Sequence, residues 1–208
     1  MINLFIDTSY KALVLGLLKD DTIIDQIQIM SEFNFSEIML PQLDKLLRKN
    51  DLKPNEIKKI FVVVGPGSFT GIRIGLTAAK ILAQVLDIKI IPLSSLEFMA
   101  TTDVETKYLI SVIDARHDMV FGGIYNRNGD CICEDKYCQL DELINTARDS
   151  YTIVTYDNNT ISDSIIPKYN IEKIVSHHLN DEGKNALEVN PNYLKKTEAE
   201  EKLNDKRS

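Results

Sequence analysis

Residues 62–75 read Val-Val-Val-Gly-Pro-Gly-Ser-Phe-Thr-Gly-Ile-Arg-Ile-Gly, and this stretch carries the strongest local signal in the chain. The apolar run at 60–64 predicts a buried strand, which a glycine-rich turn joins to a helix over 70–86. Gly71 and Gly75 are four residues apart, so they lie on one face of that helix. Each interior glycine costs roughly 1 kcal/mol relative to alanine. We therefore expect this face to meet a ligand or another backbone at close range.

The glycine-rich loops that bind phosphate do not fit this segment. A P-loop requires Lys followed by Ser or Thr after its last glycine, whereas Gly71 is followed by Ile72 and Arg73. A dinucleotide-binding turn requires an acidic residue at the end of the next strand, but the strand at 88–91 runs into Pro92. The remaining alternative is a tight strand-to-helix turn with a closely packed helix.

The composition is that of an ordinary globular protein. The chain of 208 residues has room for one large domain or two small lobes, and it is 44% hydrophobic and 26% charged. Its formal net charge of −7 gives no basic footprint, so strong binding of nucleic acid by the chain alone is not expected. Residues 1–7 contain no basic region, and no apolar run approaches about 18 residues. We expect a cytoplasmic protein with no membrane contact.

Cysteine and histidine do not form the pattern of a metal site. The three cysteines, Cys131, Cys133 and Cys138, are an odd number, as is typical of a reduced cytosolic chain. A structural zinc site needs four ligands, and the histidines lie far from these cysteines in the sequence, so we predict no metal and a strand at 131–138. The adjacent pair His177-His178 is interpreted as solvated loop residues whose side chains point apart.

The hydrophobic periodicity predicts two copies of one arrangement. The first copy contains three strands of an antiparallel meander, a helix capped by Ser36, and a strand–helix–strand unit, at 2–6, 12–18, 22–29, 35–47 and 60–91. The second copy repeats three strands, a helix and a fourth strand, at 108–113, 119–125, 131–138, 140–147 and 151–156. Each copy opens with a strand that ends in aspartate, so the turns Asp7-Thr8-Ser9 and Asp114-Ala115-Arg116 occupy equivalent positions.

This duplicated layout resembles the actin-like ATPase and sugar-kinase superfamily. In that superfamily, two facing hairpins hold the phosphates of ATP between two lobes. The resemblance implies an α/β protein with the two-lobed actin-like ATPase (ribonuclease H-like) fold, duplicated, with a reduced second lobe. We expect the first lobe at 1–103, the second lobe at 104–190, and the segment 191–208 packed against the first lobe.

Several motifs, in their order along the chain, make the resemblance more specific. They are Asp7-Thr8-Ser9, Gly65–Gly75, Pro92–Glu97, Asp114-Ala115-Arg116, and Pro191–Leu194 with Glu198-Ala199-Glu200. On these motifs the chain is similar to the TsaB (YeaZ) family from its first strand nearly to its end. The segment Gly65–Gly75 is the most specific of them.

The resemblance implies a role in the formation of threonylcarbamoyladenosine, the modified nucleoside next to the anticodon of tRNAs that read codons beginning with A. In this role a TsaB protein is a non-catalytic scaffold that binds and activates its catalytic paralogue TsaD, and the small ATPase TsaE joins the two. A homodimer is expected when the protein is alone. The resemblance implies contact with tRNA only through the complex, and no cofactor is expected.

The residues themselves also favour a non-catalytic protein. Phosphate hairpins use glycine so that backbone N–H groups can approach the phosphate, and the two equivalent turns here contain none. We interpret Asp7, Thr8, Ser9 and Asp114 as parts of degenerate phosphate turns. The two aspartates are either caps of the strand ends or carboxylates for a metal or a base. An actin-like phosphotransferase or a peptidase-type enzyme remains the alternative.

Two helices are predicted to form a partner surface. Helix 35–47 carries more apolar positions than one buried stripe needs, because Leu40 lies off its main apolar line. The glycine helix adds small residues, and its arginine is suited to a charge-assisted bond with a partner. The predicted partner residues are Phe35, Ile38, Met39, Gly71, Arg73, Ile74, Gly75 and Ala78. The alternative is that the glycines only let this helix lie close to its own sheet or to helix 35–47.

Overall fold

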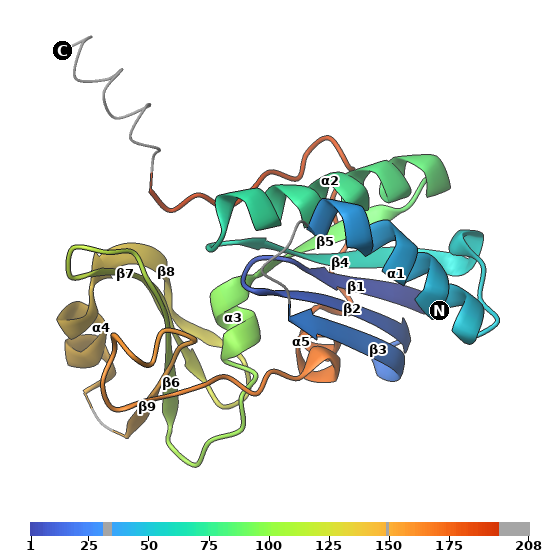
Figure 1. Ribbon diagram of the computed structural model, residues 1–208. Coiled ribbons are helices and arrows are strands. Elements are labelled where there is room, and N and C mark those ends of the chain that lie inside the picture. Colours follow the sequence, from blue (N-terminus) through green and yellow to red (C-terminus); the bar gives the residue numbers. More distant parts are fainter. Residues whose placement is uncertain (31–34, 149, 196–208) are drawn as a thin grey trace, which may run out of the picture.

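The computed structural model describes residues 1–30, 35–148 and 150–195, which form two lobes side by side (Figure 1). Each lobe is built on one five-stranded mixed sheet. The first sheet has the order β3-β2-β1-β4-β5, with β1 Ile2–Asp7, β2 Ala12–Lys19, β3 Thr22–Met30, β4 Ile57–Gly65 and β5 Lys89–Ser94. The second has the order β10-β9-β6-β7-β8, with β6 Tyr108–Asp114, β7 Met119–Asn126, β8 Cys131–Gln139, β9 Tyr151–Val154 and β10 Ser164–Ile165.

The two sheets have the same topology when the second is read from β8. In the first sheet β1 pairs antiparallel with β2, β2 antiparallel with β3, and β4 parallel with both β1 and β5. In the second sheet β6 pairs antiparallel with β7, β7 antiparallel with β8, and β9 parallel with both β6 and β10. The predicted duplicated α/β fold is therefore confirmed. The second copy is the reduced one, because β9 has 4 residues and β10 has 2, against 9 in β4 and 6 in β5.

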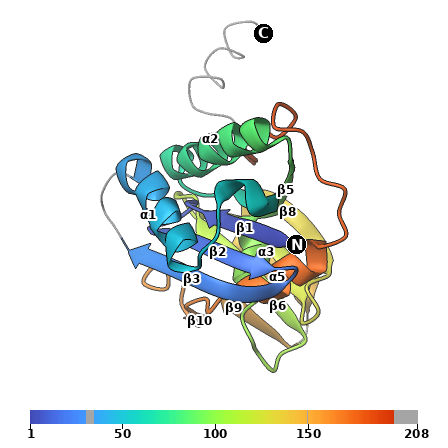
Figure 2. The ribbon, with the colours of Figure 1, turned by 90° about the vertical axis from the view of Figure 1, so that its right-hand side faces the viewer.

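Helices α1 (Phe35–Lys49) and α2 (Phe69–Leu86) lie together over one face of the first sheet (Figure 2). Their inner residues join the even-numbered residues of β1 in one apolar core. Ser68 begins α2 because its hydroxyl accepts a hydrogen bond from the Gly71 N–H, a cap worth about 1 kcal/mol. Asp87 ends it in the left-handed conformation, with φ of 52°. By length and composition α2 is apolar enough to cross a membrane, but here it covers the sheet of the first lobe.

Three shorter helices complete the lobes, together with a 3-10 turn at Pro54–Glu56. Helix α4 (Leu140–Ala147) covers the second sheet. Helix α3 (Ser95–Met99) follows β5 and packs against both sheets, with Phe98 in the core of the first lobe and Leu96 in that of the second. Helix α5 (Ile171–His178) follows β10 and packs against the first sheet, next to α3. The division of the chain at 103/104 stays a prediction.

The described part of the C-terminal segment runs along the first lobe towards the second (Figure 1). Lys184 forms an isolated antiparallel bridge with Ile90 at the edge of β5. Further along, the Asn192 N–H donates to the Val64 carbonyl oxygen at 2.8 Å, which fixes the segment at the end of β4. Residues 196–208, for which packing against the first lobe is also predicted, lie outside the described residues.

Candidate functional site

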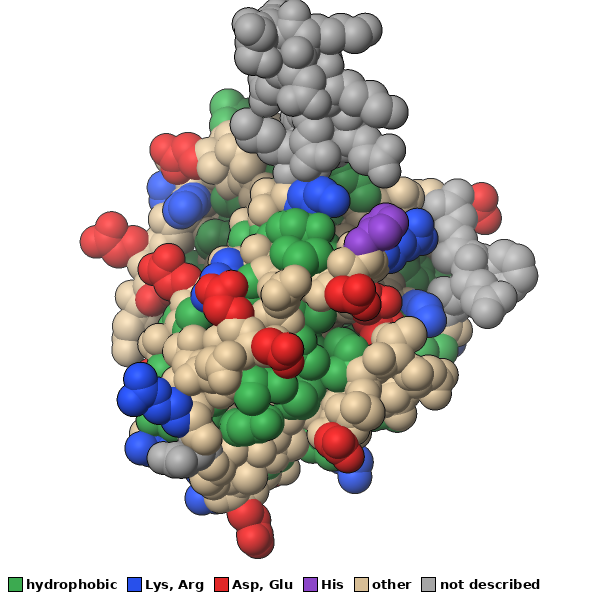
Figure 3. All heavy atoms as spheres, turned by 90° about the vertical axis from the view of Figure 1, so that its left-hand side faces the viewer, with side chains coloured by type: hydrophobic (Ala, Val, Ile, Leu, Met, Phe, Trp, Pro, Cys, Tyr) green, Lys and Arg blue, Asp and Glu red, His purple; other side chains and the backbone are tan. Residues whose placement is uncertain are grey.

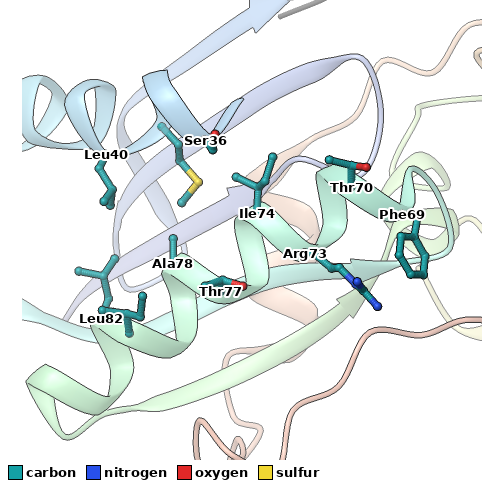
Figure 4. A pocket seen from close by; sticks show the side chains of 11 residues that line it. Ser36, Leu40, Phe69, Thr70, Arg73, Ile74, Thr77, Ala78 and Leu82 are labelled. Carbon is teal, nitrogen blue, oxygen red and sulfur yellow. The ribbon is translucent and has the colours of Figure 1, made fainter. Parts of the chain in front are cut away.

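A groove of about 580 Å³ lies between α1 and α2 on the outer side of the first lobe, and we call it the α1–α2 groove (Figure 4). Its lining is mostly apolar and comes from both helices: Ser36, Met39, Leu40, Phe69, Thr70, Arg73, Ile74, Thr77, Ala78, Ile81 and Leu82. Leu40 is 53% exposed and Ile81 is 58% exposed. Large apolar side chains gathered in one exposed hollow are typical of a surface that binds a protein partner.

The groove contains some of the residues predicted for a partner surface and not others. Arg73, Ile74, Ala78 and Met39 line it, although Met39 is 1% exposed and lies at its floor. Phe35 is buried in the core, and Ile38 packs against that core without lining the groove. Phe69, Thr77 and Ile81 also line the groove and are absent from the predicted partner residues. With Arg73 these residues follow a spacing of four, which the sequence shows and which marks a second face of α2.

Gly71 and Gly75 do not belong to this surface, and here the sequence prediction is corrected. Both are buried on the inner side of α2, against the turn that follows β1. A Cβ added at Gly71 would lie 2.0 Å from the Thr8 carbonyl oxygen, and one at Gly75 would lie 2.3 Å from Thr8 Oγ1. The close contact that the glycines allow is therefore internal, as the alternative interpretation held.

Thr8 joins this turn to α2 through its hydroxyl group. Thr8 Oγ1 donates to the Gly71 carbonyl oxygen at 2.7 Å and accepts from the Gly75 N–H at 3.1 Å. In an α-helix the N–H of residue i and the carbonyl oxygen of residue i−4 form one backbone hydrogen bond. The Thr8 hydroxyl therefore contacts both groups of a single such pair. Ser9 adds a contact, since its carbonyl oxygen accepts from the Ser68 N–H at 2.7 Å. The first turn is thus filled by the protein's own helix.

The two aspartates at the ends of β1 and β6 cap their own turns. Asp7 Oδ1 accepts from the Ser9 N–H at 2.7 Å, and Asp114 Oδ1 accepts from the Arg116 N–H at 2.8 Å. This geometry supports the cap interpretation over a role as metal or base carboxylates. Asp7 is buried, and burial raises the pKa of its carboxyl group, whereas Asp114 is exposed.

A tyrosine contact crosses between the lobes beside these turns. The Tyr10 hydroxyl donates to Asp157 Oδ1 at 3.0 Å, and the rings of Tyr10 and Tyr156 stack with centroids 4.3 Å apart. Asp157 Oδ2 also accepts from the Asp114 N–H at 3.1 Å. One carboxylate is therefore hydrogen-bonded both to Tyr10, beside the turn after β1, and to the turn after β6. Burial, with the nearby Asp157 charge, raises the pKa of Tyr10 to about 12. The space between the two turns is therefore bridged by side chains of the chain itself.

The pair His177-His178 lies in a helix and not in a loop, which corrects a second expectation, although His177 is exposed as a solvated residue would be. They end α5, and their rings do not point apart but stack with centroids 5.0 Å apart. His178 Nε2 lies 2.7 Å from Glu97 Oε1 on α3, and its Nδ1 lies 2.8 Å from Asp181 Oδ2. The hydrogen bond to Glu97 raises the pKa of His178 to about 9, so this histidine is charged at neutral pH and links α5 to α3.

The described residues do not assemble a metal centre. No group of three or more His, Cys, Asp or Glu side chains within 1–30, 35–148 and 150–195 has the geometry to hold an ion. The three cysteines are free thiols on β8, which confirms the predicted strand. On the face of the second lobe drawn in Figure 3, acidic and basic side chains are interspersed.

Comparison with known proteins identifies the family. Over residues 28–162 the chain matches the family model described as "TsaD: tRNA N6-adenosine threonylcarbamoyltransferase". It is 43% identical over 131 residues to the "tRNA threonylcarbamoyladenosine biosynthesis protein TsaB" of Bacillus subtilis (strain 168), covering 62% of this chain and 57% of that relative. It is 28% identical over 223 residues to the protein of the same name from Haemophilus influenzae, covering 92% of each. The chain belongs to the TsaB (YeaZ) family, which shares the TsaD-type domain.

Solved structures of this family have the same fold. "YeaZ from Pseudomonas aeruginosa" gives a TM-score of 0.75 at 20% identity, covering 93% of this chain and 99% of that chain. A second Pseudomonas aeruginosa protein, described as having "similarity to peptidase YEAZ", gives a TM-score of 0.79 at 20% identity with the same coverage. These comparisons concern the fold, and they confirm the predicted two-lobed arrangement.

The family match also bears on the groove. The matched residues 28–162 include all of α1 and α2 and hence every residue that lines the α1–α2 groove. The alignment with the Bacillus subtilis TsaB protein spans 57% of the length of that relative. The TsaB family takes its name from tRNA threonylcarbamoyladenosine biosynthesis, as the resemblance of the sequence motifs implied.

Proposed function

We propose that this TsaB-family chain is a non-catalytic subunit of the machinery that forms threonylcarbamoyladenosine next to the anticodon of tRNA. It binds and activates a TsaD-type catalytic paralogue, and the TsaE ATPase joins the pair in the cytoplasm. The names of its relatives support the pathway. The α1–α2 groove is the observation that carries the mechanism.

The groove suits a partner with the same fold. Its exposed apolar side chains lie on two neighbouring helices, and a paralogue presents the same helix pair, so four helices would pack together. Burying a large aliphatic side chain contributes roughly 1.5–3 kcal/mol, which makes half-exposed residues such as Leu40 and Ile81 strong contributors. In the absence of the paralogue, a second copy of the chain covers the same groove as a homodimer.

A non-catalytic role is supported by the two turns. Thr8 bonds to α2, and Asp7 and Asp114 cap their own backbones, so these side chains are already engaged. The contact between Tyr10 and Asp157 spans the space between the lobes. The net charge of −7 supports contact with tRNA only through the complex.

The proposal is tested with a charge placed in the groove. Leu40→Asp should weaken pairing with the TsaD-type paralogue at least about 100-fold, because it places a carboxylate in an apolar contact. Leu187→Asp is the matched control, since Leu187 is 82% exposed and lies outside the groove. Pairing is measured by calorimetry with purified proteins. The melting temperature of each variant shows that it remains folded.

The same variants connect the groove to tRNA. In cells depleted of the native protein, the Leu187→Asp chain should restore threonylcarbamoyladenosine and the Leu40→Asp chain should not, as measured by mass spectrometry of tRNA nucleosides. An unchanged nucleoside level after depletion would contradict the pathway. Restoration by the Leu40→Asp chain would contradict the groove as the docking surface.

A further inference from the structure

Arg73 is the one charged residue among the described residues that line the α1–α2 groove. Its guanidinium carbon lies 3.9 Å from the centroid of the Phe69 ring, and Figure 4 shows the two side chains together near the start of α2. Its Nε donates a hydrogen bond to the Tyr193 hydroxyl at 3.0 Å. The Phe69 and Tyr193 rings stack with centroids 4.8 Å apart. A side chain that normally samples many rotamers is therefore held in one position at the rim of the groove.

Tyr193 is itself held from both sides. Before it, the Asn192 N–H is bonded to the Val64 carbonyl oxygen at 2.8 Å. After it, Lys195 Nζ lies 5.0 Å from the centroid of the Tyr137 ring on β8, in the second lobe. The segment 192–195 thus connects the end of β4, the start of α2 and the second lobe. This connection fixes the hydroxyl group that orients Arg73.

The positive charge of Arg73 is not neutralised within the described chain. Every salt bridge found there involves other residues. Stacking on Phe69 and the hydrogen bond of Nε do not use the terminal N–H groups of the guanidinium. Those groups can donate two parallel hydrogen bonds to the two oxygens of a carboxylate. A fixed cation beside an apolar groove is best matched by an apolar helix with one acidic side chain at that end.

We propose that Arg73 determines the specificity of the groove by pairing with an Asp or Glu carboxylate on the helix of the paralogue that docks there, and that Tyr193 positions it. This inference rests on the proposed function, in which a TsaD-type paralogue occupies the groove. Burial of apolar side chains supplies most of the affinity. The ion pair of Arg73 determines which partner binds and how its helix is aligned along the groove.

The first experiment measures the dissociation constant of the complex with the paralogue. Arg73→Gln should weaken pairing about 10- to 100-fold and reduce its dependence on salt, since an ion pair at the contact is lost. Lys45→Gln is the control, because Lys45 is an exposed cation on α1 outside the groove. Tight pairing by the Arg73→Gln chain, equal to that of the control, would overturn the inference.

Tyr193 is tested by a double-mutant cycle. Tyr193→Phe keeps the ring but removes the hydroxyl group, and it should weaken pairing about fivefold in the native chain. In the Arg73→Gln background the same change should have no further effect, because the hydroxyl acts only through Arg73. Additive effects would overturn the positioning role.

The remaining outcomes distinguish other sources of the carboxylate. A chain that ends at Lys195 lacks Glu198, Glu200 and Glu201. If this shortened chain pairs normally and Arg73→Gln no longer matters in it, the carboxylate belongs to its own tail and the inference fails. If Arg73→Gln changes only the homodimer, measured by sedimentation equilibrium, the inference also fails. If the native chain does not bind the paralogue at all, the proposed function fails together with the inference. If Leu40→Asp weakens pairing and Arg73→Gln does not, only the role of Arg73 is overturned.

Discussion

The turns after β1 and after β6 are equivalent in sequence and topology, yet only the first is built into a core. Each has an aspartate whose carboxylate accepts from the N–H two residues on. The first turn lies under α2, with Thr8 buried and bonded to two helix backbone groups. The second has Ala115 in place of Thr8, and the described residues between β9 and β10 contain no helix to cover it. The two copies therefore share the backbone arrangement of the hairpin, and they differ in whether a helix packs on its turn.

This difference also places the candidate docking surface. The groove exists only where two helices lie side by side on one sheet, and the first lobe alone has such a pair among the described elements. Packing of α2 through its glycine face leaves its opposite face, with Phe69, Thr77 and Ile81, exposed to a partner. Internal packing and partner binding are thus divided between two faces of one helix.

The largest effect is expected for Gly71→Ala. An added Cβ would lie 2.0 Å from the Thr8 carbonyl oxygen, a backbone atom that can move only if the whole turn moves. The change should lower the free energy of unfolding by about 3 kcal/mol or more, although alanine normally favours a helix over glycine. Urea unfolding measures the loss.

Gly75→Ala provides the matched control for Gly71→Ala. Its Cβ would meet the Thr8 hydroxyl rather than a backbone atom. Adding Thr8→Ala should therefore recover the free energy of unfolding lost in Gly75→Ala, but not that lost in Gly71→Ala. Equal rescue at both positions would contradict the assigned contacts.

Thr8→Val should cost about 2 kcal/mol in the free energy of unfolding. The side chain keeps its shape but loses hydrogen bonds to Gly71 and Gly75 in a buried position. Ala115→Thr, the reverse change at the equivalent turn, should alter stability by less than about 0.5 kcal/mol, because no helix lies there to accept the hydroxyl. Similar effects at the two turns would remove the contrast between the lobes.

His178→Gln tests the contact between α5 and α3. The pKa of His178 is raised from 6.5 to about 9 in the folded chain, so its contribution is complete below pH 6.5 and is lost as the pH rises through 9. After allowance for solvent screening, we expect a difference of about 1 kcal/mol between native and variant chains at pH 6. The difference should vanish above pH 9.5 or so in thermal unfolding, by the same linkage argument. A difference that is constant with pH would contradict the charged pair with Glu97.

Tyr10→Phe removes the hydrogen bond that joins the first turn to Asp157 of the second lobe. The expected loss is about 0.5–1 kcal/mol, since this residue is only partly buried. Tyr10 has a pKa of about 12, raised from 10, so the native contribution is present below pH 10 and is lost as the pH rises from 10 through 12. Tyr151→Phe, on β9, is a control tyrosine outside this contact.

The smallest expected effect is that of Mg-ATP. Because the first turn is filled by α2 and the space between the turns is crossed by Tyr10, we expect affinity no tighter than high micromolar, no hydrolysis and no change in melting temperature. Calorimetry on the isolated chain is the measurement. A low-micromolar site within one protomer would show that the turns remain competent for phosphate and would revive the phosphotransferase alternative.

Much of the fold could be predicted from local sequence. Period-two strands, the helix signal after residue 70 and the repeated aspartate at two strand ends fix the elements and their duplication, because these signals arise from neighbours along the chain. The family followed from the glycine motif. The candidate site was predicted only in part, since the glycine spacing shows that one face of α2 needs a close neighbour but not which neighbour it is.

The sequence by itself determined the two-lobed α/β architecture and the family, but it left the roles of Asp7 and Asp114 open between caps and carboxylates for a metal or a base. The tertiary structure decided that Thr8 is the neighbour of the glycine face, that His178 pairs with Glu97, and that Arg73 is held by Tyr193. Those pairs are separated by 63, 81 and 120 residues. No local pattern encodes such a contact, because it exists only after the sheets and helices have packed and brought distant side chains to one place.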